Sequence, residues 1–149
     1  MQLLPIRRDG TIADQTLPLP PEAREVLSTF AGSYAKAFLP PWIGYIAVEN
    51  AEAVGTCAFK SPPAGGRVEI AYFTFPAHEG RGVATRMARE LISLARTTDP
   101  SVQMIAQTMP SENASTRILR KLGFVHACDA QDHEIGHCWE WHLPRDSGT

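Results

Sequence analysis

The sequence predicts a mixed α/β (α+β) fold in which helices pack against a sheet. Strand-like runs rich in β-branched and aromatic residues alternate with segments of helical periodicity. Turn-forming Gly, Pro and Asn residues separate these segments, and the order along the chain is helix, three strands, helix, strand, helix, two strands. A chain of 149 residues has the length of one domain, so we expect residues 1–149 to form a single domain.

The N-terminal half should contain one helix and three strands. Residues 1–20 include the motif LPLPP and are expected to form an irregular segment. Pro21 suits the first position of a helix, where no N–H donor is needed. Apolar residues recur at helical spacing through 22–38, and Pro40 and Pro41 end this helix. The strands follow as a hairpin, a loop and a third strand: Ile43–Val48, Val54–Phe59, loop 61–66, and Val68–Phe75.

The C-terminal half should contain two helices and three strands. A long amphipathic helix covers Val83–Ala95, and Val102–Thr108 forms a strand. Asn113 is a good N-cap for a short helix that ends before Gly123. Two strands follow, and the period-2 rule places one set of residues of the last strand on one face: Ile135, His137, Trp139, Trp141 and Leu143.

Composition excludes several classes of protein. The formal net charge is −2, which argues against a nucleic-acid partner, because phosphate binding relies on excess Lys and Arg. We expect no membrane partner, because no run of about 18 apolar residues is present. The N-terminal residues lack the apolar stretch of a signal peptide. Three cysteines are an odd number that fits reduced thiols, so we expect a cytoplasmic protein.

The segment from Val68 to Ala84 predicts an anion site. A strand ends, a glycine turn follows and a helix begins, so free N–H groups and the positive end of the helix dipole meet at the turn. Glycine lets the backbone approach a ligand closely, and Arg81 adds a full positive charge. A plain strand-to-helix turn is the alternative. The segment is neither a P-loop nor a Rossmann fingerprint, because GxxxxGK[ST] and GxGxxG are both absent.

At these residues the sequence resembles the GNAT acetyltransferases, which carry a Gln/Arg-x-x-Gly-x-Gly/Ala motif between a strand and a helix. The matching positions are Glu79, Gly82 and Ala84, and Glu79 departs from the usual Gln or Arg. The resemblance implies a single-domain, mostly antiparallel mixed sheet flanked by helices. It also implies that backbone amides bind the coenzyme A pyrophosphate and that a strand pairs with the pantetheine arm. The residues concerned are Gly80, Arg81, Gly82, Val83, Ala84 and Thr85 for the pyrophosphate, and Phe73, Thr74 and Phe75 for the arm.

A second block, from Asn113 to Phe124, resembles the Asn, short helix and Lys-x-Gly-Phe of the same family. By this resemblance Asn113 binds the pantetheine arm and Ser115 lies nearby; a simple helix cap is the alternative for Asn113. The resemblance spans Ile43 to Leu143, and the residues of the two motifs are most similar to those of the branch of ribosomal-protein alanine acetyltransferases. Branch similarity does not fix the substrate.

The resemblance implies that the acetyl group of acetyl-CoA is transferred to a primary amine by direct attack in a ternary complex. A backbone N–H near Phe73–Phe75 would stabilise the oxyanion. Glu69 is the candidate general base, with a solvent-facing edge carboxylate as the alternative; His78 could also serve, although an exposed histidine is the simpler interpretation. The usual tyrosine acid is absent, because Leu119 occupies its position. Its substitutes are Ser115, Tyr72 or a water.

Histidines and cysteines cluster near the C-terminus, which raises the question of zinc: His126, Cys128, His133, His137, Cys138 and His142. No CxxC pair is present, and His137 and Cys138 are adjacent, so in a strand they point to opposite faces. We therefore expect no metal.

Two alternatives to acetyl transfer remain open. One is an acyltransferase that uses a longer acyl donor. The other is a non-catalytic acyl-CoA-binding domain, in which Trp42 or Tyr72 could plug the acceptor end. The amine acceptor is not identified by the sequence, and a homodimer is expected only because dimers are common in such families.

Overall fold

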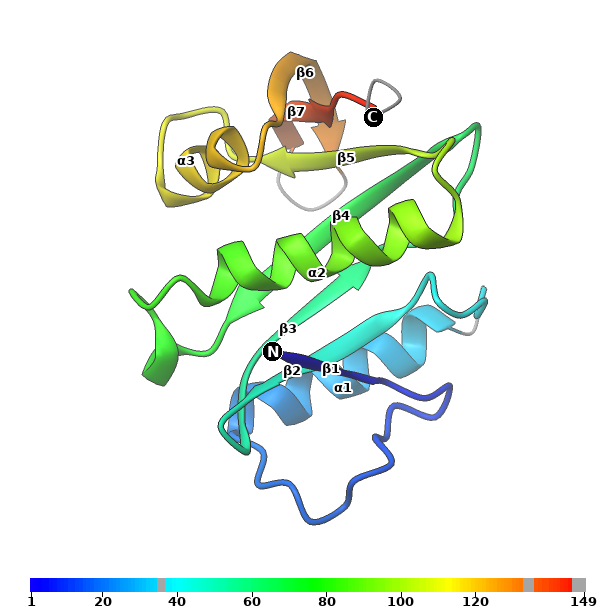
Figure 1. The fold of residues 1–149 in the computed structure, drawn as a ribbon, viewed down its shortest axis with the longest axis vertical. Helices are drawn as coiled ribbons and strands as arrows, with labels where there is room; N and C mark the ends of the chain where they lie inside the picture. The colour runs from blue at the N-terminus through cyan, green and yellow to red at the C-terminus, as the bar shows by residue number, and fades with distance from the viewer. Residues whose placement is uncertain (35–36, 133–135, 146–149) are drawn as a thin grey trace.

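A computed structural model describes residues 1–34, 37–132 and 136–145. In chain order its elements are β1 (Gln2–Pro5), α1 (Pro21–Tyr34), β2 (Gly44–Glu49), β3 (Glu52–Phe59), β4 (Arg67–Thr74), the 3₁₀ turn η1 (Pro76–His78), α2 (Val83–Thr98), β5 (Gln103–Thr108), α3 (Ala114–Lys121), β6 (Val125–Asp132) and β7 (Gly136–Leu143). Figure 1 shows these elements arranged around one twisted sheet.

The sheet has seven strands in the order β1-β2-β3-β4-β5-β7-β6. Neighbouring strands run antiparallel except β4 and β5, which are parallel. A parallel pair needs a long crossover connection, and α2 supplies it. The prediction of a mixed, mostly antiparallel sheet flanked by helices is therefore confirmed.

Helices α1 and α2 cover opposite faces of the sheet, with α2 in front and α1 behind in Figure 1. Gly55 faces α2, since a Cβ built there would lie 2.9 Å from the terminal methyl of Met87. Gly44 faces α1: a Cβ there would meet the ring of Phe30, and its N–H donates to Tyr34 Oη at 2.6 Å. Glycine at these two positions lets each helix approach the sheet closely.

The hydrophobic core includes residues of all three helices and of the sheet. Met87 and Leu91 of α2, Leu119 of α3 and Trp141 of β7 are fully buried in it. The indole N–H of Trp141 donates to Thr108 Oγ1 at 3.0 Å, so the largest core side chain has a polar partner. Helix α2 follows the apolar spacing that predicted it, because its buried residues recur every three or four positions.

The prediction that the whole of residues 1–20 is irregular is wrong at its start. Gln2–Pro5 forms the edge strand β1 and pairs with β2 from Gln2↔Val48 to Pro5↔Tyr45. This strand is stabilised by backbone bonds to a distant segment, and Pro5 is tolerated because one side of an edge strand has no ladder.

Two other predicted boundaries differ from the structure. Helix α1 ends at Tyr34, and residues 37–39 are not helical; residues 35 and 36 lie outside the described residues. In the last strand Trp141 and Leu143 are buried as predicted, but His137 is exposed near the start of β7. Ile135 lies outside the described residues.

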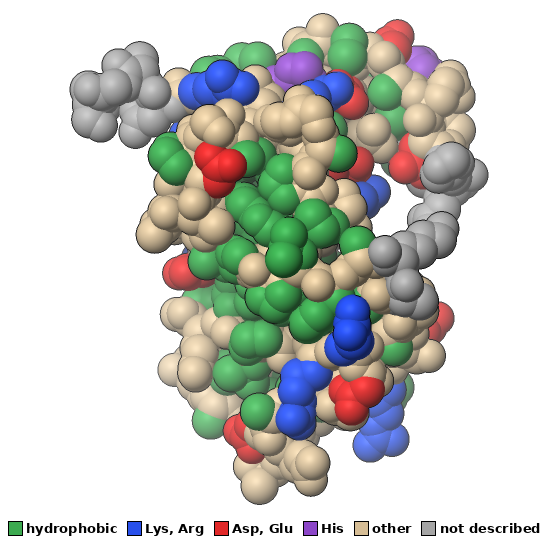
Figure 2. Space-filling model, turned by 90° about the vertical axis from the view of Figure 1, so that its right-hand side faces the viewer, with side chains coloured by type: hydrophobic (Ala, Val, Ile, Leu, Met, Phe, Trp, Pro, Cys, Tyr) green, Lys and Arg blue, Asp and Glu red, His purple; other side chains and the backbone are tan. Residues whose placement is uncertain are grey.

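Hydrophobic side chains also reach the surface. Figure 2 shows them gathered in a band on the face at the right of Figure 1, with charged side chains mostly around the band. Exposed apolar surface of this kind is typical of ligand grooves and contact surfaces. None of the helices in the described ranges is long and apolar enough to cross a bilayer.

Candidate functional site

Strands β4 and β5 separate part-way along the sheet. In the described part of the chain they pair only at Arg67↔Gln103, Val68↔Met104 and Glu69↔Ile105. Beyond Glu69, β4 continues beside β3, whereas β5 continues beside β7. Figure 1 shows the two strands diverging. An opening therefore lies inside the sheet, with its apex at Glu69.

Beyond Glu69, the β4 backbone groups that face this opening have no partner strand within the described residues. Gln103 N–H donates to Gly66 C=O across the β4–β5 side, whereas Glu69 C=O accepts from Lys60 N–H on the β3 side. Backbone groups of successive residues point to alternate sides of a strand. Tyr72 and Thr74 consequently direct their N–H and C=O groups into the opening.

The strand predicted to bind the pantetheine arm does not present all of its residues to the opening. Its three residues are Phe73, Thr74 and Phe75. Only Thr74 directs its backbone into the opening, because the N–H of Phe75 donates to Val54 C=O on the β3 side. The ring of Phe75 is buried, whereas that of Phe73 is 45% exposed. Met109, directly after β5, is 52% exposed. Both strands that border the opening thus end near an exposed apolar side chain.

The glycine turn joins β4 to α2. Gly80 and Gly82 have φ of +76° and +75°, a left-handed backbone that glycine adopts without strain. Gly82 is the N-cap of α2 and forms no side-chain cap, and Arg86 N–H makes the first bond of the helix, to Gly82 C=O. The amides of Val83, Ala84 and Thr85 therefore lack helical partners. A Cβ at Gly80 would meet no atom within 4 Å, so the turn is open.

The side chains of the turn divide by exposure. Val83 and Thr85 are buried, so these residues offer only their backbone amides. Arg81 and Glu79 are exposed at the turn. No carboxylate lies in the first turn of α2, so the positive end of its dipole is not neutralised there. The predicted anion site has the geometry that phosphate binding requires.

Helix α3 begins with a complete capping box. Asn113 Oδ1 accepts from Thr116 N–H at 3.1 Å, and Thr116 Oγ1 accepts from Asn113 N–H at 2.9 Å. The prediction that Asn113 caps this helix is confirmed, and its side-chain NH₂ is not part of the capping box. Ser115 is half-buried in the first turn. Leu119 is fully buried, so the position of the usual tyrosine is part of the core.

Glu69 stands at the apex of the opening and forms an ion pair with Lys60. The carboxylate lies 2.7 Å from Lys60 Nζ, and its side chain is 18% exposed. The Glu69 carboxylate is therefore paired and only partly exposed. His78 is also not free at the surface: its Nε2 lies 3.6 Å from Glu52 Oε2 and its side chain is 16% exposed.

Residues 3–125 match the family model of the acetyltransferase (GNAT) domain. The chain belongs to the GNAT acetyltransferase family. It is accordingly an acyltransferase, and the resemblance on which the sequence analysis relied is confirmed. A comparison with curated protein sequences gives no match.

Solved GNAT structures share the fold of this chain. The ribosomal-protein-S5-alanine acetyltransferase of Vibrio fischeri superposes with a TM-score of 0.64 at 16% identity, covering 87% of this chain and 74% of that chain. RimL, a ribosomal L7/L12 acetyltransferase in complex with coenzyme A, gives 0.64 at 13%, covering 89% and 77%. The microcin C7 self-immunity acetyltransferase MccE, in complex with acetyl-CoA and AMP, gives 0.64 at 12%, covering 81% and 69%.

This GNAT domain also carries a charged cluster beside the apex, which sequence reasoning missed. Glu69, Ile105 and His142 form one row across β4, β5 and β7, so His142 and Glu140 lie on the same face as Glu69. Glu140 Oε2 accepts from Arg67 Nη2 at 2.6 Å and lies 2.8 Å from His142 Nε2.

The charge of Glu140 is stabilised by these partners. Burial alone would raise the pKa of Glu140, but hydrogen bonds from His142 and Arg67 outweigh burial and lower it. Cys128 Sγ lies 3.5 Å from the same carboxylate oxygen. Burial and the nearby Glu140 charge raise the pKa of the Cys128 thiol.

The predicted histidine and cysteine cluster does not converge on one point in the described residues. His126 lies against the indoles of Trp139 and Trp141, and Cys138 is buried. His133 lies outside the described residues. The structure instead brings Cys128 and His142 together with Glu140, and their ligand atoms lie within 4.8 Å of one another.

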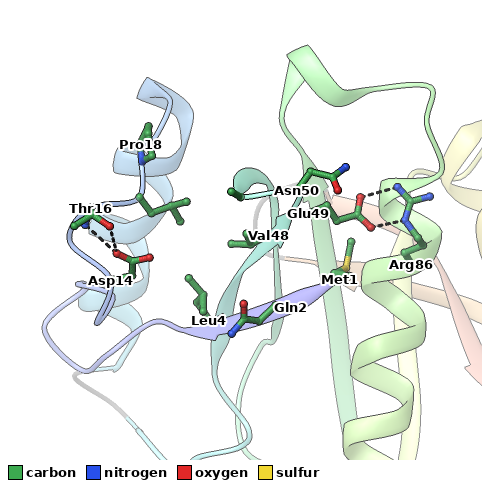
Figure 3. A pocket seen from close by; sticks show the side chains of 12 residues that line it. Met1, Gln2, Leu4, Asp14, Thr16, Pro18, Val48, Glu49, Asn50 and Arg86 are labelled. Carbon is green, nitrogen blue, oxygen red and sulfur yellow. Dashed lines mark hydrogen bonds and ion pairs between the residues drawn. The ribbon is translucent and has the colours of Figure 1, made fainter.

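A separate hollow of about 1090 Å³ lies beside the N-terminal strand (Figure 3). Val48, Glu49 and Asn50 from the β2–β3 hairpin border it together with Arg86 of α2. Among the described residues that line it, none belongs to β4 or β5. The hollow is therefore distinct from the opening in the sheet.

Proposed function

We propose that this chain is an N-acetyltransferase that moves the acetyl group of acetyl-CoA to a primary amine of a small molecule or of a peptide or protein N-terminus. One observation carries the proposal. The opening between β4 and β5 is lined by unpaired backbone groups, and β4 leads from its apex at Glu69 to the free amides of the glycine turn. An extended ligand with amide groups and a phosphate end fits this arrangement.

The residues present suit acetyl-CoA as the donor substrate. The amides of Gly80–Thr85 would bind the pyrophosphate, and Arg81 would add a cation. Tyr72 and Thr74 would pair with the pantetheine amides through their C=O groups, and one of the two also through its N–H. Phe73 and Met109 would cover its apolar segments, since both are exposed without ligand. Asn113 and Ser115 would contact the arm from α3.

The proposed reaction is direct attack in a ternary complex. The amine nitrogen attacks the thioester carbonyl, a C–N bond forms and the C–S bond breaks. Glu69 accepts the proton that the amine loses, directly or through a water. The N–H of Tyr72 or Thr74 stabilises the oxyanion, because both amides face the opening.

The proton for the leaving thiolate is best supplied by water. Leu119 has no proton to give, and burial raises the pKa of Tyr72 to about 12. A thiolate, whose conjugate acid ordinarily has a pKa of about 8.5, is a good leaving group and can take its proton from solvent after the C–S bond has broken, so no side-chain acid is required. Ser115 is not a better acid than Tyr72, because an alkyl hydroxyl holds its proton more tightly than a phenol does.

Residues 1–149 are proposed to act as one cytoplasmic domain without a resident metal. One sheet includes β1 from the N-terminus and β7 from the C-terminus, which supports a single folding unit. All three thiols are free and two of them are buried, which suits a reducing compartment. A homodimer and the lack of nucleic-acid or membrane partners stay predictions from the sequence.

Two alternatives to acetyl transfer are considered separately: a binding-only domain and an acyltransferase that uses a longer acyl donor. A binding-only domain could have its acceptor end plugged by Trp42 or Tyr72. Trp42 is buried and packs edge-on against Phe59 with centroids 5.0 Å apart, which argues against a plug formed by Trp42. A longer acyl donor is tested by comparing acetyl-CoA with propionyl-CoA and butyryl-CoA as substrates.

The test is calorimetric titration of the folded protein with acetyl-CoA and coenzyme A. Gly82→Trp should abolish binding, because φ is +75° and a Cβ would already lie 3.1 Å from Arg86 Nη1. Gly65→Trp is the matched control, since Gly65 also has a positive φ but lies in an open loop before β4. Binding lost only in Gly82→Trp supports the site. A folded wild-type protein that binds neither ligand overturns the proposal.

A further inference from the structure

The side chain of Arg86 connects the β2–β3 hairpin to the glycine turn. Its Nε and Nη2 donate to the two carboxylate oxygens of Glu49 at 2.7 and 2.8 Å. Its Nη1 donates to the carbonyl oxygen of Arg81 at 2.8 Å. Figure 3 shows the Glu49 carboxylate facing the Arg86 guanidinium at the edge of the hollow. One guanidinium therefore holds two segments that are distant in the sequence.

The bond to Arg81 orients the peptide unit that forms the anion site. The Arg81 carbonyl and the Gly82 N–H belong to the same planar trans peptide, so they point in opposite directions. Because Arg86 binds the carbonyl from one side, the Gly82 N–H is directed to the other. Gly82 also lets the guanidinium approach, since a Cβ there would lie 3.1 Å from Nη1.

The location of Arg86 is otherwise unfavourable. A cation near the N-terminus of a helix opposes the helix dipole. The ion pair is partly exposed, with side chains 42% and 20% exposed, and exposed ion pairs add little to stability. The position of Arg86 is explained by its bidentate pair with Glu49, which fixes the plane of the guanidinium and leaves Nη1 to bind the turn.

We propose that Arg86 and Glu49 are positioning residues for the donor's pyrophosphate: Glu49 orients Arg86, and Arg86 holds the Arg81–Gly82 peptide with its N–H toward the anion. The inference rests on the proposed function, in which this turn binds coenzyme A. Each of the three guanidinium nitrogens of Arg86 already donates one hydrogen bond to Glu49 or Arg81, so the role proposed for Arg86 is to orient the turn.

The experiment compares three ligands by calorimetry: acetyl-CoA, 3′-phosphoadenosine 5′-diphosphate, which keeps the pyrophosphate end, and S-acetyl-pantetheine, which lacks it. Arg86→Met should weaken the first two about tenfold, the loss expected for a charge-assisted hydrogen bond, and leave the third unchanged. Arg86→Lys should fail to restore binding, because an ammonium lacks the planar fork. Glu49→Gln should lose less, since an amide keeps one hydrogen bond.

Arg89→Met is the matched control, because Arg89 is an exposed arginine one turn further along α2. It should bind all three ligands as the wild-type protein does. Circular dichroism identifies any variant that fails to fold. If Arg86→Met does not fold, the affinities of Arg86→Lys and Glu49→Gln are the ones to compare with that of the wild-type protein. Wild-type affinity in Arg86→Lys, or an equal loss for S-acetyl-pantetheine, overturns the positioning role. A wild-type protein that binds no coenzyme A overturns the proposed function as well.

Discussion

Glu69 is the last residue of β4 that pairs with β5, opposite Ile105, and its carboxylate lies 2.7 Å from the ammonium of Lys60. The apex of the opening therefore holds an acidic group whose orientation is fixed by a cation on the neighbouring strand end. In the proposed reaction this carboxylate meets the amine that attacks the thioester. The same ion pair allows the base and its partner to be tested separately.

Glu69→Gln should lower kcat by roughly 10²-fold or more, because general-base catalysis typically contributes that much, and should leave acetyl-CoA affinity unchanged. The measurement is thiol release from acetyl-CoA with a panel of primary amines, beside calorimetric titration of the donor. Lys60→Met keeps the carboxylate and should retain most of the activity. A Glu69→Gln enzyme with an undiminished kcat would remove Glu69 from the mechanism.

Asn113→Asp separates helix capping from donor binding. Aspartate caps a helix as well as asparagine does, so the melting temperature should not fall. The side-chain NH₂ is lost, so the affinity for coenzyme A should weaken by about three- to tenfold if it contacts the arm. Asn113→Ala should lose affinity and also about 1 kcal/mol of stability, measured by urea unfolding. Wild-type affinity in Asn113→Asp would leave Asn113 with a structural role alone.

Most of the fold was predictable because its elements follow from local patterns. The apolar spacing of α2, the Asn113 cap and the glycine turn all appear as predicted. Strand β1 was missed because an edge strand of four residues has no pattern of its own. Its partners, from Val48 to Tyr45, are forty or more positions away in the sequence.

The contacts around the site were less predictable, for the same reason. Arg86 and Glu49 are separated by 37 positions, and Arg67 and Glu140 by 73. Only the tertiary fold brings such pairs together. An arginine near the start of α2, where a cation opposes the dipole, is the one sequence signal that could have pointed to a special role.

Restoring the tyrosine that many GNAT enzymes carry should harm this one. Leu119 is fully buried in the core that includes Phe124 and Trp141, so a tyrosine would overfill the site. Leu119→Tyr should destabilise the protein by about 1–3 kcal/mol in urea unfolding and should not raise kcat. Leu119→Met, which nearly conserves volume, is the control and should cost less. A more active and equally stable Leu119→Tyr enzyme would show that the position opens toward the thioester.

Glu140 should make stability depend on pH. The Glu140 carboxylate accepts hydrogen bonds from Arg67 and His142, and its pKa lies below the ordinary 4.5. The stabilisation of the folded protein by this charge is therefore fully present above pH 4.5 and is lost as the pH falls through the lowered pKa. Glu140→Gln should therefore cost about 1–3 kcal/mol at neutral pH in urea unfolding. The difference from the wild-type protein should begin to shrink below pH 4.5, where the carboxylate is protonated in the unfolded chain, and should be lost once the pH falls through the lowered pKa of the folded protein.

The control for this titration is Glu112→Gln, which removes an exposed carboxylate that also pairs with an arginine, Arg120. Exposed pairs are screened by solvent, so this variant should differ little from the wild-type protein at either pH. Burial distinguishes the two carboxylates, because the side chain of Glu140 is 11% exposed and that of Glu112 is 53% exposed. A stability difference for Glu140→Gln that does not change with pH would mean that the substitution acts through packing, and that the charge of Glu140 contributes nothing.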